Sequence, residues 1–363
     1  MTVGGTIPLS RIVQEDVQSI LSHVGPRCHA LSGKRLLVTG GTGFIGSYLL
    51  ETLAYLNDRV LAEPCALSVV TRDIGRVANR LPQLRQRHDF TFIESDIRKF
   101  RSASGSWDYV IHGAASADAR VFLEDPSEIM DIIAEGTKVV LNEAASGVES
   151  FLFISSGAVY GQQPCEYARL PEDYLGGPDL RHWRSCYGEA KRYAEMLCQA
   201  SSEKRKLPVT IARVFAVLGP YQETHSTSAV IDFIRQALRG DTITIKDSGE
   251  TERSYCYVAD AVSGLLTLLL QPSPGEVFNV GSDMESVSFT ELAHRVSRCL
   301  GKDVKVVVEG SSASGVLGSR YAPDVARLHA KVGFRPTTGL DEALTRTISW
   351  MKERDEANSH AIP

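Results

Sequence analysis

The chain has 363 residues, of which 43% are hydrophobic and 23% are charged, and its formal net charge is −5. This length can bury a large core, and the slightly acidic balance gives no sign of a nucleic-acid-binding surface. The longest apolar run, residues 264–270, is far shorter than the roughly 20 residues of a membrane-spanning helix, and no secretory signal is evident. Seven scattered cysteines without a CxxC pair favour reduced thiols over disulfides or a zinc site. We therefore expect a cytoplasmic protein that binds no membrane, nucleic acid or metal.

A helical extension is predicted over residues 1–34, where Val13, Val17 and Ile20 recur at helical spacing. From residue 35 short apolar segments alternate with helical ones. Strands are expected at 35–40, 67–72, 90–95, 109–114, 151–156 and 209–215, and the most prominent helices at 127–146 and 187–202. This alternation predicts an α/β fold, in which a doubly wound parallel sheet is covered by helices on both faces.

The pattern changes after residue 216. A helix near 227–239, a short strand at "TITI", the segment 253–258 and a strand at 276–281 follow, and we expect this last strand to return to the main sheet. The sequence therefore predicts a first domain over 35–215 and a smaller α/β substrate-binding domain over 216–350, interleaved with it. The tail, 351–363, is expected to be loosely ordered.

The segment "VTGGTGFIG" follows the first expected strand and opens the first helix of that domain. Gly40, Gly43 and Gly46 are three apart, while Gly41, Gly43 and Gly46 also satisfy GxGxxG. In either register the missing side chains let the turn tighten and the backbone approach a pyrophosphate, which the helix N-terminus attracts. Because strand, turn and helix are all present, the segment predicts a Rossmann-like dinucleotide site rather than a plain glycine-rich turn.

The end of the second expected strand bears on which dinucleotide binds. NAD-binding folds commonly place an acidic residue there to hold the ribose 2′-hydroxyl. Here Thr71 is followed by Arg72 and then Asp73. Arg72 could accept a 2′-phosphate and favour NADP, Asp73 could reach the ribose and favour NAD, or both could form a solvated turn. The choice between NAD and NADP stays open.

The stretch "SCYGEAKRY" places Tyr187 and Lys191 four residues apart in an expected helix, so they share one face. Taken alone, such a pair more often forms a solvated helix face than a catalytic group. With Ser156 at the end of an expected strand and the glycine turn upstream, these residues become candidates for catalysis, because doubly wound sheets bind ligands at the carboxyl ends of their strands.

Several motifs in a fixed order make the chain resemble the extended short-chain dehydrogenase/reductase family, specifically its nucleotide-sugar epimerases and dehydratases. The motifs are "TGGTGFIG" (39–46), "SDI" (95–97), "HGAA" (112–115), "SSGAVYG" (155–161), "YGEAK" (187–191), "RVFAVLGP" (213–220), "RSYCYVAD" (253–260), "FNVGS" (278–282) and "RYAPDVARL" (320–328). The resemblance covers roughly residues 35–350.

The resemblance implies roles for Ser156, Tyr187 and Lys191. Tyr187 would take a proton from a sugar hydroxyl as hydride leaves the same carbon for the nicotinamide, and Ser156 would hydrogen-bond the reacting oxygen. Lys191 would hold the nicotinamide ribose and, with the nicotinamide charge, pull the pKa of Tyr187 from about 10 toward neutrality.

The resemblance also implies further binding residues. Cofactor contacts would come from Phe44, Ile45, Arg72, Asp96, Ile97, Ala114 and Ala115. Contacts to a nucleotide-diphosphate sugar would come from Gly157, Ala158, Ala216, Arg253 and Arg320. The two arginines would meet the diphosphate, although either one could instead form a surface salt bridge.

The chain departs from the family pattern at Gly157 and Ala158. Sugar 4,6-dehydratases usually carry Asp and Glu there and decarboxylating relatives usually keep the Glu, so these two residues argue against both reactions. Cys165, Cys186 and Glu189 are possible but weak replacements as proton carriers. Ala216, and Ile133 in the helix near 127–146, stand where asparagine would be expected, which indicates an unusual substrate.

The sequence therefore predicts a nucleotide-sugar epimerase that oxidises its substrate transiently with a tightly bound NAD or NADP. The alternatives are a dehydratase-like enzyme, an NADPH-dependent keto-sugar reductase, and a non-catalytic NAD(P)-binding scaffold. The resemblance also implies a homodimer that pairs the helices near 127–146 and 187–202 of each subunit.

Overall fold

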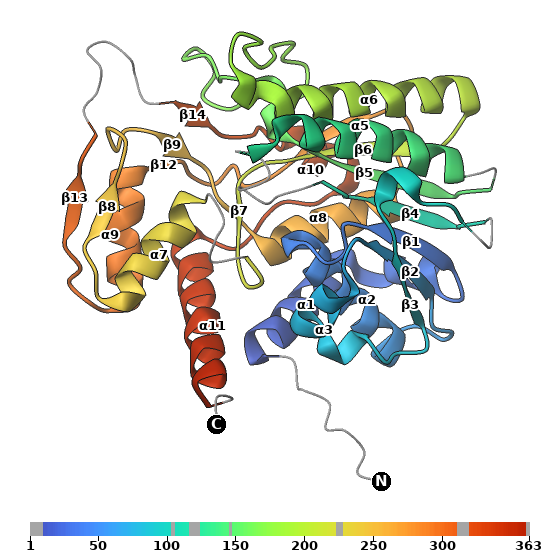
Figure 1. Cartoon of the computed structure of the whole chain (residues 1–363), viewed down its shortest axis with the longest axis horizontal. Helices are drawn as coiled ribbons and strands as arrows, with labels where there is room; N and C mark the ends of the chain where they lie inside the picture. The colour runs from blue at the N-terminus through green and yellow to red at the C-terminus, as the bar shows by residue number, and fades with distance from the viewer. Residues whose placement is uncertain are drawn as a thin grey trace.

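A computed structural model describes residues 10–102, 106–115, 124–144, 147–222, 228–310 and 319–360, and Figure 1 shows its arrangement. Its centre is a seven-stranded sheet in the order β11-β6-β5-β4-β1-β2-β3, and every neighbouring pair is parallel. The strands are β1 (Arg35–Thr39), β2 (Ala66–Thr71), β3 (Phe90–Glu94), β4 (Tyr109–His112), β5 (Ser150–Ser156), β6 (Val209–Val214) and β11 (Val277–Val280). This sheet confirms the predicted doubly wound α/β fold and the return of the strand near 276–281.

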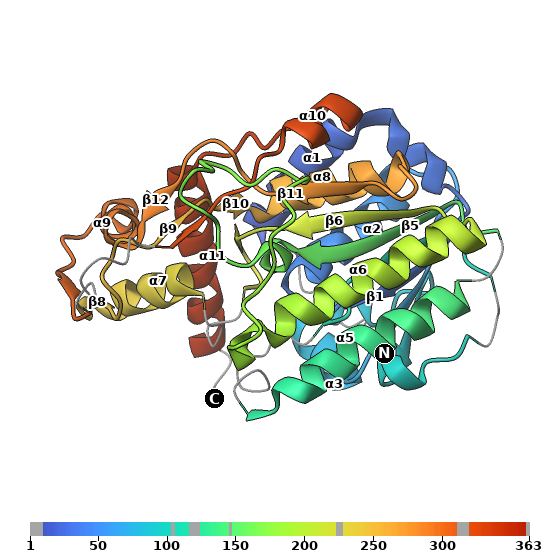
Figure 2. The ribbon, with the colours of Figure 1, turned by 90° about the horizontal axis from the view of Figure 1, so that it is seen from above.

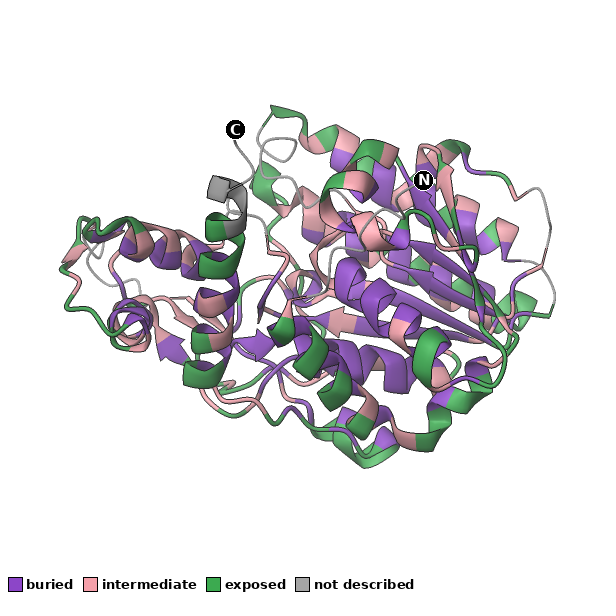
Figure 3. Ribbon diagram, turned by 90° about the horizontal axis from the view of Figure 1, so that it is seen from below, coloured by how far each residue is buried: buried purple, intermediate pink, exposed green. Residues whose placement is uncertain are grey.

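Helices cover both faces of the sheet, as Figures 1 and 2 show. One face carries α5 (Pro126–Glu143) and α6 (Cys186–Arg205), and the other carries α1 (Arg11–Val24), α2 (Phe44–Arg59), α3 (Ile74–Arg80) and α8 (Val258–Leu270). Every residue of α8 except the last is buried, which explains the apolar run at 264–270 as a core helix. Figure 3 shows the buried strands between the inward sides of these helices.

The predicted N-terminal helix is present as α1, and a buried carboxylate attaches it to the body of the protein. Asp16 accepts hydrogen bonds from the hydroxyls of Tyr48 (2.8 Å) and Tyr257 (2.6 Å) and forms an ion pair with Arg346 (2.8 Å). These partners come from three distant parts of the chain, so α1 is an integral part of the fold. The first nine residues lie outside the described part.

A smaller lobe stands beside the main sheet, on the left in Figure 1. It contains α7 (Ala229–Arg239), β8 (Ile243–Ile245), β9 (Glu252–Arg253), β12 (Val287–Ser288), α9 (Phe289–Leu300), β13 (Val306–Val308) and β14 (Arg320–Tyr321). Strands β12, β9 and β14 form one small sheet, and β13 pairs with β8. The segment 253–258 contributes to two sheets, because β10 (Cys256–Tyr257) pairs with β7 (Val217–Leu218). The predicted domain limits themselves stay a prediction.

The C-terminal segment differs from the sequence-based expectation. After α10 (Ala326–Val332), helix α11 (Leu340–His360) continues far into the segment that was expected to be loosely ordered, so that expectation is wrong up to His360. The helix forms because Ile348, Trp350 and Met351 are buried against the core, which stabilises the following charged turns. Within the described residues, no helix is long and apolar enough to cross a membrane.

Candidate active site

The glycine-rich turn between β1 and α2 uses Gly40, Gly43 and Gly46. Gly40 has a φ of +76°, and a Cβ there would lie 2.5 Å from the Gly113 carbonyl oxygen. A Cβ on Gly46 would collide with the Gly40 carbonyl oxygen, and Gly43 is the N-cap of α2. The turn therefore has no room for side chains at two of these positions. It leaves backbone N–H groups at a helix N-terminus, a cradle that fits a dinucleotide pyrophosphate.

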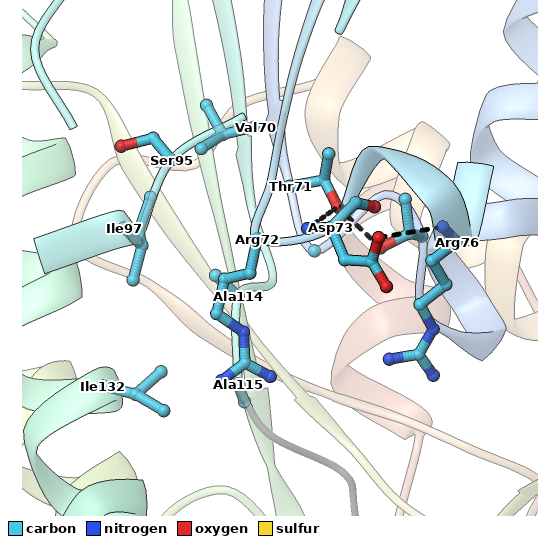
Figure 4. Close-up of a pocket in the computed structure, with 12 residues that line it drawn as sticks. Val70, Thr71, Arg72, Asp73, Arg76, Ser95, Ile97, Ala114, Ala115 and Ile132 are labelled. Carbon is cyan, nitrogen blue, oxygen red and sulfur yellow. Dashed lines mark hydrogen bonds between the residues drawn. The ribbon is translucent and has the colours of Figure 1, made fainter. Parts of the chain in front are cut away.

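A cavity of about 390 Å³ lies beside this turn and is shown in Figure 4. Its lining residues, at the ends of β2, β3 and β4 and on α5, include Gly40, Thr42, Val70, Thr71, Arg72, Asp73, Arg76, Ser95, Ile97, Ala114, Ala115 and Ile132. It adjoins the switch point of the sheet, between β1 and β4, where doubly wound folds bind their ligands.

Arg72 and Asp73 both line this cavity, and both are exposed. Figure 4 shows the Asp73 carboxylate turned toward the start of α3, where one of its oxygens accepts hydrogen bonds from the N–H groups of Gly75 (2.7 Å) and Arg76 (3.2 Å). Asp73 is thus the N-cap of α3, and only one of its two carboxylate oxygens takes part in this cap. This geometry allows either residue to reach an adenosine ribose.

The neighbouring wall differs partly from the sequence-based expectation. Ile97, Ala114 and Ala115 line the cavity, whereas Asp96 is not among its described lining residues, and the cofactor role of all four residues stays a prediction. The Asp96 carboxylate accepts from the N–H of Arg98 (2.9 Å) and forms an ion pair with its guanidinium (2.6 Å). Ser95 takes the polar position on the wall instead.

A second cavity, of about 320 Å³, joins the glycine turn to the predicted catalytic residues. Its walls include Phe44, Ile45 and Gly46 from α2, Ser156 from the end of β5, and Tyr187 and Lys191 from α6. Gly40 and Ala115 line both cavities, so the two adjoin. The fold therefore brings the turn and the Ser-Tyr-Lys set into one continuous hollow, although they are distant in the sequence.

The surroundings of Lys191 and Tyr187 shift the pKa of both side chains. The Lys191 side chain is buried, its ammonium donates to the Ile154 carbonyl (2.8 Å) and lies over the Phe153 ring, and burial lowers its pKa to about 8. Burial raises the pKa of Tyr187, and the nearby Ser156 hydroxyl opposes this rise. The Lys191 ammonium is directed to a backbone carbonyl, and the expected lowering of the Tyr187 pKa by Lys191 and the nicotinamide charge stays a prediction.

Two buried networks hold these residues in place. On one side, Glu195 accepts from Ser155 (2.6 Å) and pairs with Arg213 (2.6 Å), which ties α6 to the ends of β5 and β6. On the other, the His112 ring bridges the hydroxyls of Thr39 (2.7 Å) and Thr137 (3.0 Å). Burial lowers the pKa of His112 to about 3, so this histidine is neutral and serves as a structural link.

The substrate-side residues of the sequence analysis are only partly brought to this hollow. Gly157 and Ala158 begin a 3-10 turn directly after Ser156, and the Ala158 N–H donates to the Ser156 oxygen (3.2 Å). Ala216 packs against the core between Phe215 and Val217, which line the cavity. Ile133 is also a core residue.

The two predicted diphosphate arginines lie on adjacent strands of the small lobe. Arg320 forms an ion pair with Glu252 (2.7 Å). This is the salt bridge that the sequence analysis gave as the alternative to a diphosphate contact. Arg253 donates to the Ser319 carbonyl (3.0 Å), and its guanidinium lies 5.6 Å from the centre of the Tyr321 ring.

Sequence reasoning missed Tyr321. A Cβ on Gly157 would lie 2.5 Å from the Tyr321 hydroxyl, so this phenol reaches the catalytic end of β5 from the small lobe. Its place beside Arg320 in "RYAPD" was the available signal. Of the weaker proton-carrier candidates, Cys165 is exposed and Glu189 lies against Arg192 (3.5 Å), while burial raises the pKa of the Cys186 thiol.

The model of the NAD dependent epimerase/dehydratase family matches residues 36–281. This is more than half of the chain, and the chain therefore belongs to that family. The resemblance to extended short-chain dehydrogenase/reductase enzymes acting on nucleotide sugars is confirmed.

Particular relatives differ in the reaction that they catalyse. UDP-glucuronic acid decarboxylase 6 of Arabidopsis thaliana is 30% identical over 321 residues, which cover 86% of this chain and 87% of that protein. UDP-N-acetyl-alpha-D-glucosaminuronate decarboxylase of Bacillus cytotoxicus is 28% identical and covers 88% of this chain and 98% of the relative. The crystal structure of UDP-glucuronic acid 4-epimerase from Bacillus cereus with UDP-glucuronic acid and NAD is 25% identical. It covers 88% of this chain and 99% of the other, with a TM-score of 0.74.

Proposed function

We propose that this chain is a nucleotide-sugar epimerase that oxidises a ring carbon transiently and inverts it. The observation that carries the proposal is the complete Ser156, Tyr187 and Lys191 set beside the glycine cradle, followed by Gly157 and Ala158. Neither of these two residues has a side chain that can take a proton from carbon. The set is thus sufficient for oxidation and reduction at a carbinol carbon, but it lacks the base that an elimination requires.

The residues divide the work as follows. Tyr187 is the base that takes the proton of the sugar hydroxyl and returns it, and the Ser156 hydroxyl donates to the reacting oxygen. The Lys191 ammonium holds the ribose that carries the nicotinamide ring. A bound nicotinamide dinucleotide would supply the hydride acceptor for the sugar carbon and the donor for its return to the opposite face. The small lobe would hold the nucleotide diphosphate, with Arg253 as the better-placed arginine since Arg320 is already paired with Glu252.

We infer NAD rather than NADP as the dinucleotide. The family is described as NAD dependent, and the Bacillus cereus epimerase binds NAD. In this chain Asp73 lines the cavity and keeps one carboxylate oxygen that does not cap α3, which suits a ribose 2′-hydroxyl.

Decarboxylation is the second candidate, because it is the named reaction of two relatives that match most of the chain. Ala158 argues against this reaction, because decarboxylating relatives usually carry a glutamate there and alanine supplies no carboxylate. Dehydration meets the same objection. A keto-sugar reductase or a non-catalytic scaffold would also use the glycine cradle, but the scaffold would not require the Ser-Tyr-Lys set.

The test is incubation of the purified chain with a panel of UDP-, TDP-, GDP- and CDP-sugars without added cofactor, followed by chromatography and mass spectrometry. A new peak with the mass of its substrate supports the epimerase. A product lighter by carbon dioxide or by water supports the decarboxylase or the dehydratase, and consumption of added NADPH supports the reductase. If no member of the panel is converted, the non-catalytic NAD(P)-binding scaffold is the hypothesis that remains.

The homodimer is a further part of the proposal. Met130 on α5 and Tyr193 and Met196 on α6 are large apolar side chains exposed on neighbouring helices, where a second copy could cover them. Light scattering of the wild type and of Met196→Glu would show a dimer that the substitution weakens. A monomeric wild type would contradict it. The cytoplasm is the compartment that we propose.

A further inference from the structure

Tyr321 lies between the two places where the proposed substrate would be held. Its hydroxyl reaches the end of β5, where a Cβ on Gly157 would lie 2.5 Å from it, and Gly157 directly follows Ser156. Its ring lies near Arg253, whose guanidinium carbon is 5.6 Å from the ring centre. One side chain therefore joins the arginine proposed for the diphosphate to the turn that follows the catalytic serine.

Two kinds of contact fix this side chain. The backbone of β14 pairs with β9 in the register Tyr321↔Arg253, and the Ser254 N–H donates to the Tyr321 carbonyl (3.2 Å). The ring centre lies 4.6 Å from that of Phe215, which lines the same hollow as Ser156. Strand pairing and ring packing therefore hold the hydroxyl in place before a substrate arrives, so that little conformational entropy is lost on binding.

Tyr321 presents a protonated hydroxyl on a side chain that is only partly buried. It lies on the edge of the aromatic cluster that contains Tyr160 and Phe215. Burial of the hydroxyl raises the pKa of Tyr321 above its ordinary value, so the phenol keeps its proton at neutral pH. A protonated phenol can donate a hydrogen bond to a ligand oxygen, and its ring offers a flat apolar face.

The covalent structure of a nucleotide sugar directs its sugar ring past Tyr321. The sugar is attached directly to the diphosphate, and the carbon that is oxidised must reach Ser156 and Tyr187. With the diphosphate at Arg253, the sugar ring lies between these two points, as Tyr321 does. The phenol oxygen is next to residue 157, and consecutive Cα atoms are about 3.8 Å apart. It therefore meets a substituent near the reacting carbon rather than the oxygen held by Ser156.

We propose that Tyr321 is a substrate-binding residue that determines specificity for the sugar. Its ring packs against the sugar, and its hydroxyl donates to an oxygen substituent beside the reacting carbon. The inference rests on the proposed function and deepens it, because it names the part of the substrate that the small lobe recognises. It also gives Gly157 a role, since any side chain there would displace the hydroxyl.

The test is Tyr321→Phe, which keeps the ring but removes the hydroxyl. The full-length chain, saturated with NAD⁺, is titrated calorimetrically with UDP, TDP, GDP and CDP and with their sugar esters. For each nucleotide sugar that binds the wild type, affinity should fall about three- to tenfold in Tyr321→Phe, the effect of one hydrogen bond, while affinity for the diphosphate alone stays unchanged. Tyr167→Phe, in the same aromatic cluster, is the matched control and should change neither affinity.

Two further variants test the two ends of the arrangement. Arg253→Met should weaken the diphosphate and its sugar ester by the same factor, because it acts on the part that they share. Gly157→Ala brings a methyl group against the phenol oxygen, so it should lower the urea midpoint of unfolding more in the wild type than in Tyr321→Phe. This second comparison needs no sugar.

Several results would overturn the inference. These are an unchanged nucleotide-sugar affinity in Tyr321→Phe, an equal loss of affinity for the diphosphate, an undiminished diphosphate affinity in Arg253→Met, and an equal effect of Gly157→Ala in both backgrounds. Each of these leaves the proposed function standing. A wild type that binds no nucleotide sugar would overturn the inference and the proposed function together, so the two failures are distinguishable.

Discussion

The cofactor side and the substrate side of this active site are built in different ways. On the cofactor side, the glycines of the tight turn all lie within residues 40–46, and the turn follows directly from their missing side chains. On the substrate side, Ser156, Tyr187 and Tyr321 come from β5, α6 and β14, which are distant in the sequence. Helix α6 packs against β5 in the main sheet, and the small lobe brings Tyr321 to the same end of β5. If the proposed roles hold, cofactor binding would depend on local backbone geometry and catalysis on long-range packing, so substitutions should separate the two.

The largest effect is expected for Tyr187→Phe. Removing the base should lower turnover by about 10³-fold or more, while the cofactor content of the purified protein stays unchanged, because the glycine turn is intact. Turnover and bound dinucleotide are measured on the same preparation. Tyr167→Phe, a tyrosine outside the catalytic set and the proposed dimer surface, is the control. Full activity of Tyr187→Phe would mean that the substrate side was assigned wrongly.

Gly46→Ala should affect the cofactor side instead. The new methyl group collides with the Gly40 carbonyl, so the turn must open and dinucleotide affinity should fall by about 10²-fold or more. Gly339→Ala, where a Cβ meets nothing within 4 Å, is the matched control. Calorimetric titration with NAD⁺ gives the affinity, and thermal unfolding shows whether each variant is folded. Undiminished binding by a folded Gly46→Ala would contradict the assignment of the cradle.

Lys191→Met should separate stability from activity. The buried ammonium has a pKa of about 8, below the ordinary lysine value of about 10.4, so the unfolded chain binds more protons between these pH values. The contribution of Lys191 to the stability of the wild type should therefore become more favourable as the pH increases from about 8 to 10.4, and the cost of the buried charge is fully present below pH 8.

At neutral pH, in the absence of dinucleotide, Lys191→Met should accordingly be more stable than the wild type by about 1–3 kcal/mol, although inactive. Denaturant unfolding across this pH range measures the difference, which should shrink as the pH rises. A stability difference that stays constant with pH would show that burial of the charged Lys191 ammonium does not destabilise the fold.

The smallest effect is expected for Arg72→Ala. If the ribose is held by Asp73, the affinity for NAD⁺ should change by less than about threefold, whereas residual binding of NADP⁺ should fall by about tenfold with the loss of a charged donor. Calorimetry with both dinucleotides measures this. A wild type that prefers NADP⁺, and loses this preference in Arg72→Ala, would reverse the inferred cofactor.

The same contrast explains what the sequence could predict. The strands of the main sheet and the glycine turn were predicted because each is encoded within a few residues of buried or missing side chains. Strand β14 has only two residues, so no periodicity marks it, and the position of Tyr321 over Gly157 depends on pairing with β9. The ion pair of Asp96 with Arg98, two residues away, was not anticipated, and the cofactor role of Asp96 stays a prediction. The order of α11 depends on buried contacts that composition does not show.

The most direct test of the central claim is the reaction in deuterium oxide, with the nucleotide sugar that the chain converts. If Tyr187 handles only the proton of a hydroxyl and no side chain takes a proton from carbon, the product should have the mass of the substrate after transfer back to ordinary water, with no deuterium bound to carbon. A product that carries carbon-bound deuterium, or that has lost carbon dioxide or water, would contradict epimerisation by transient oxidation.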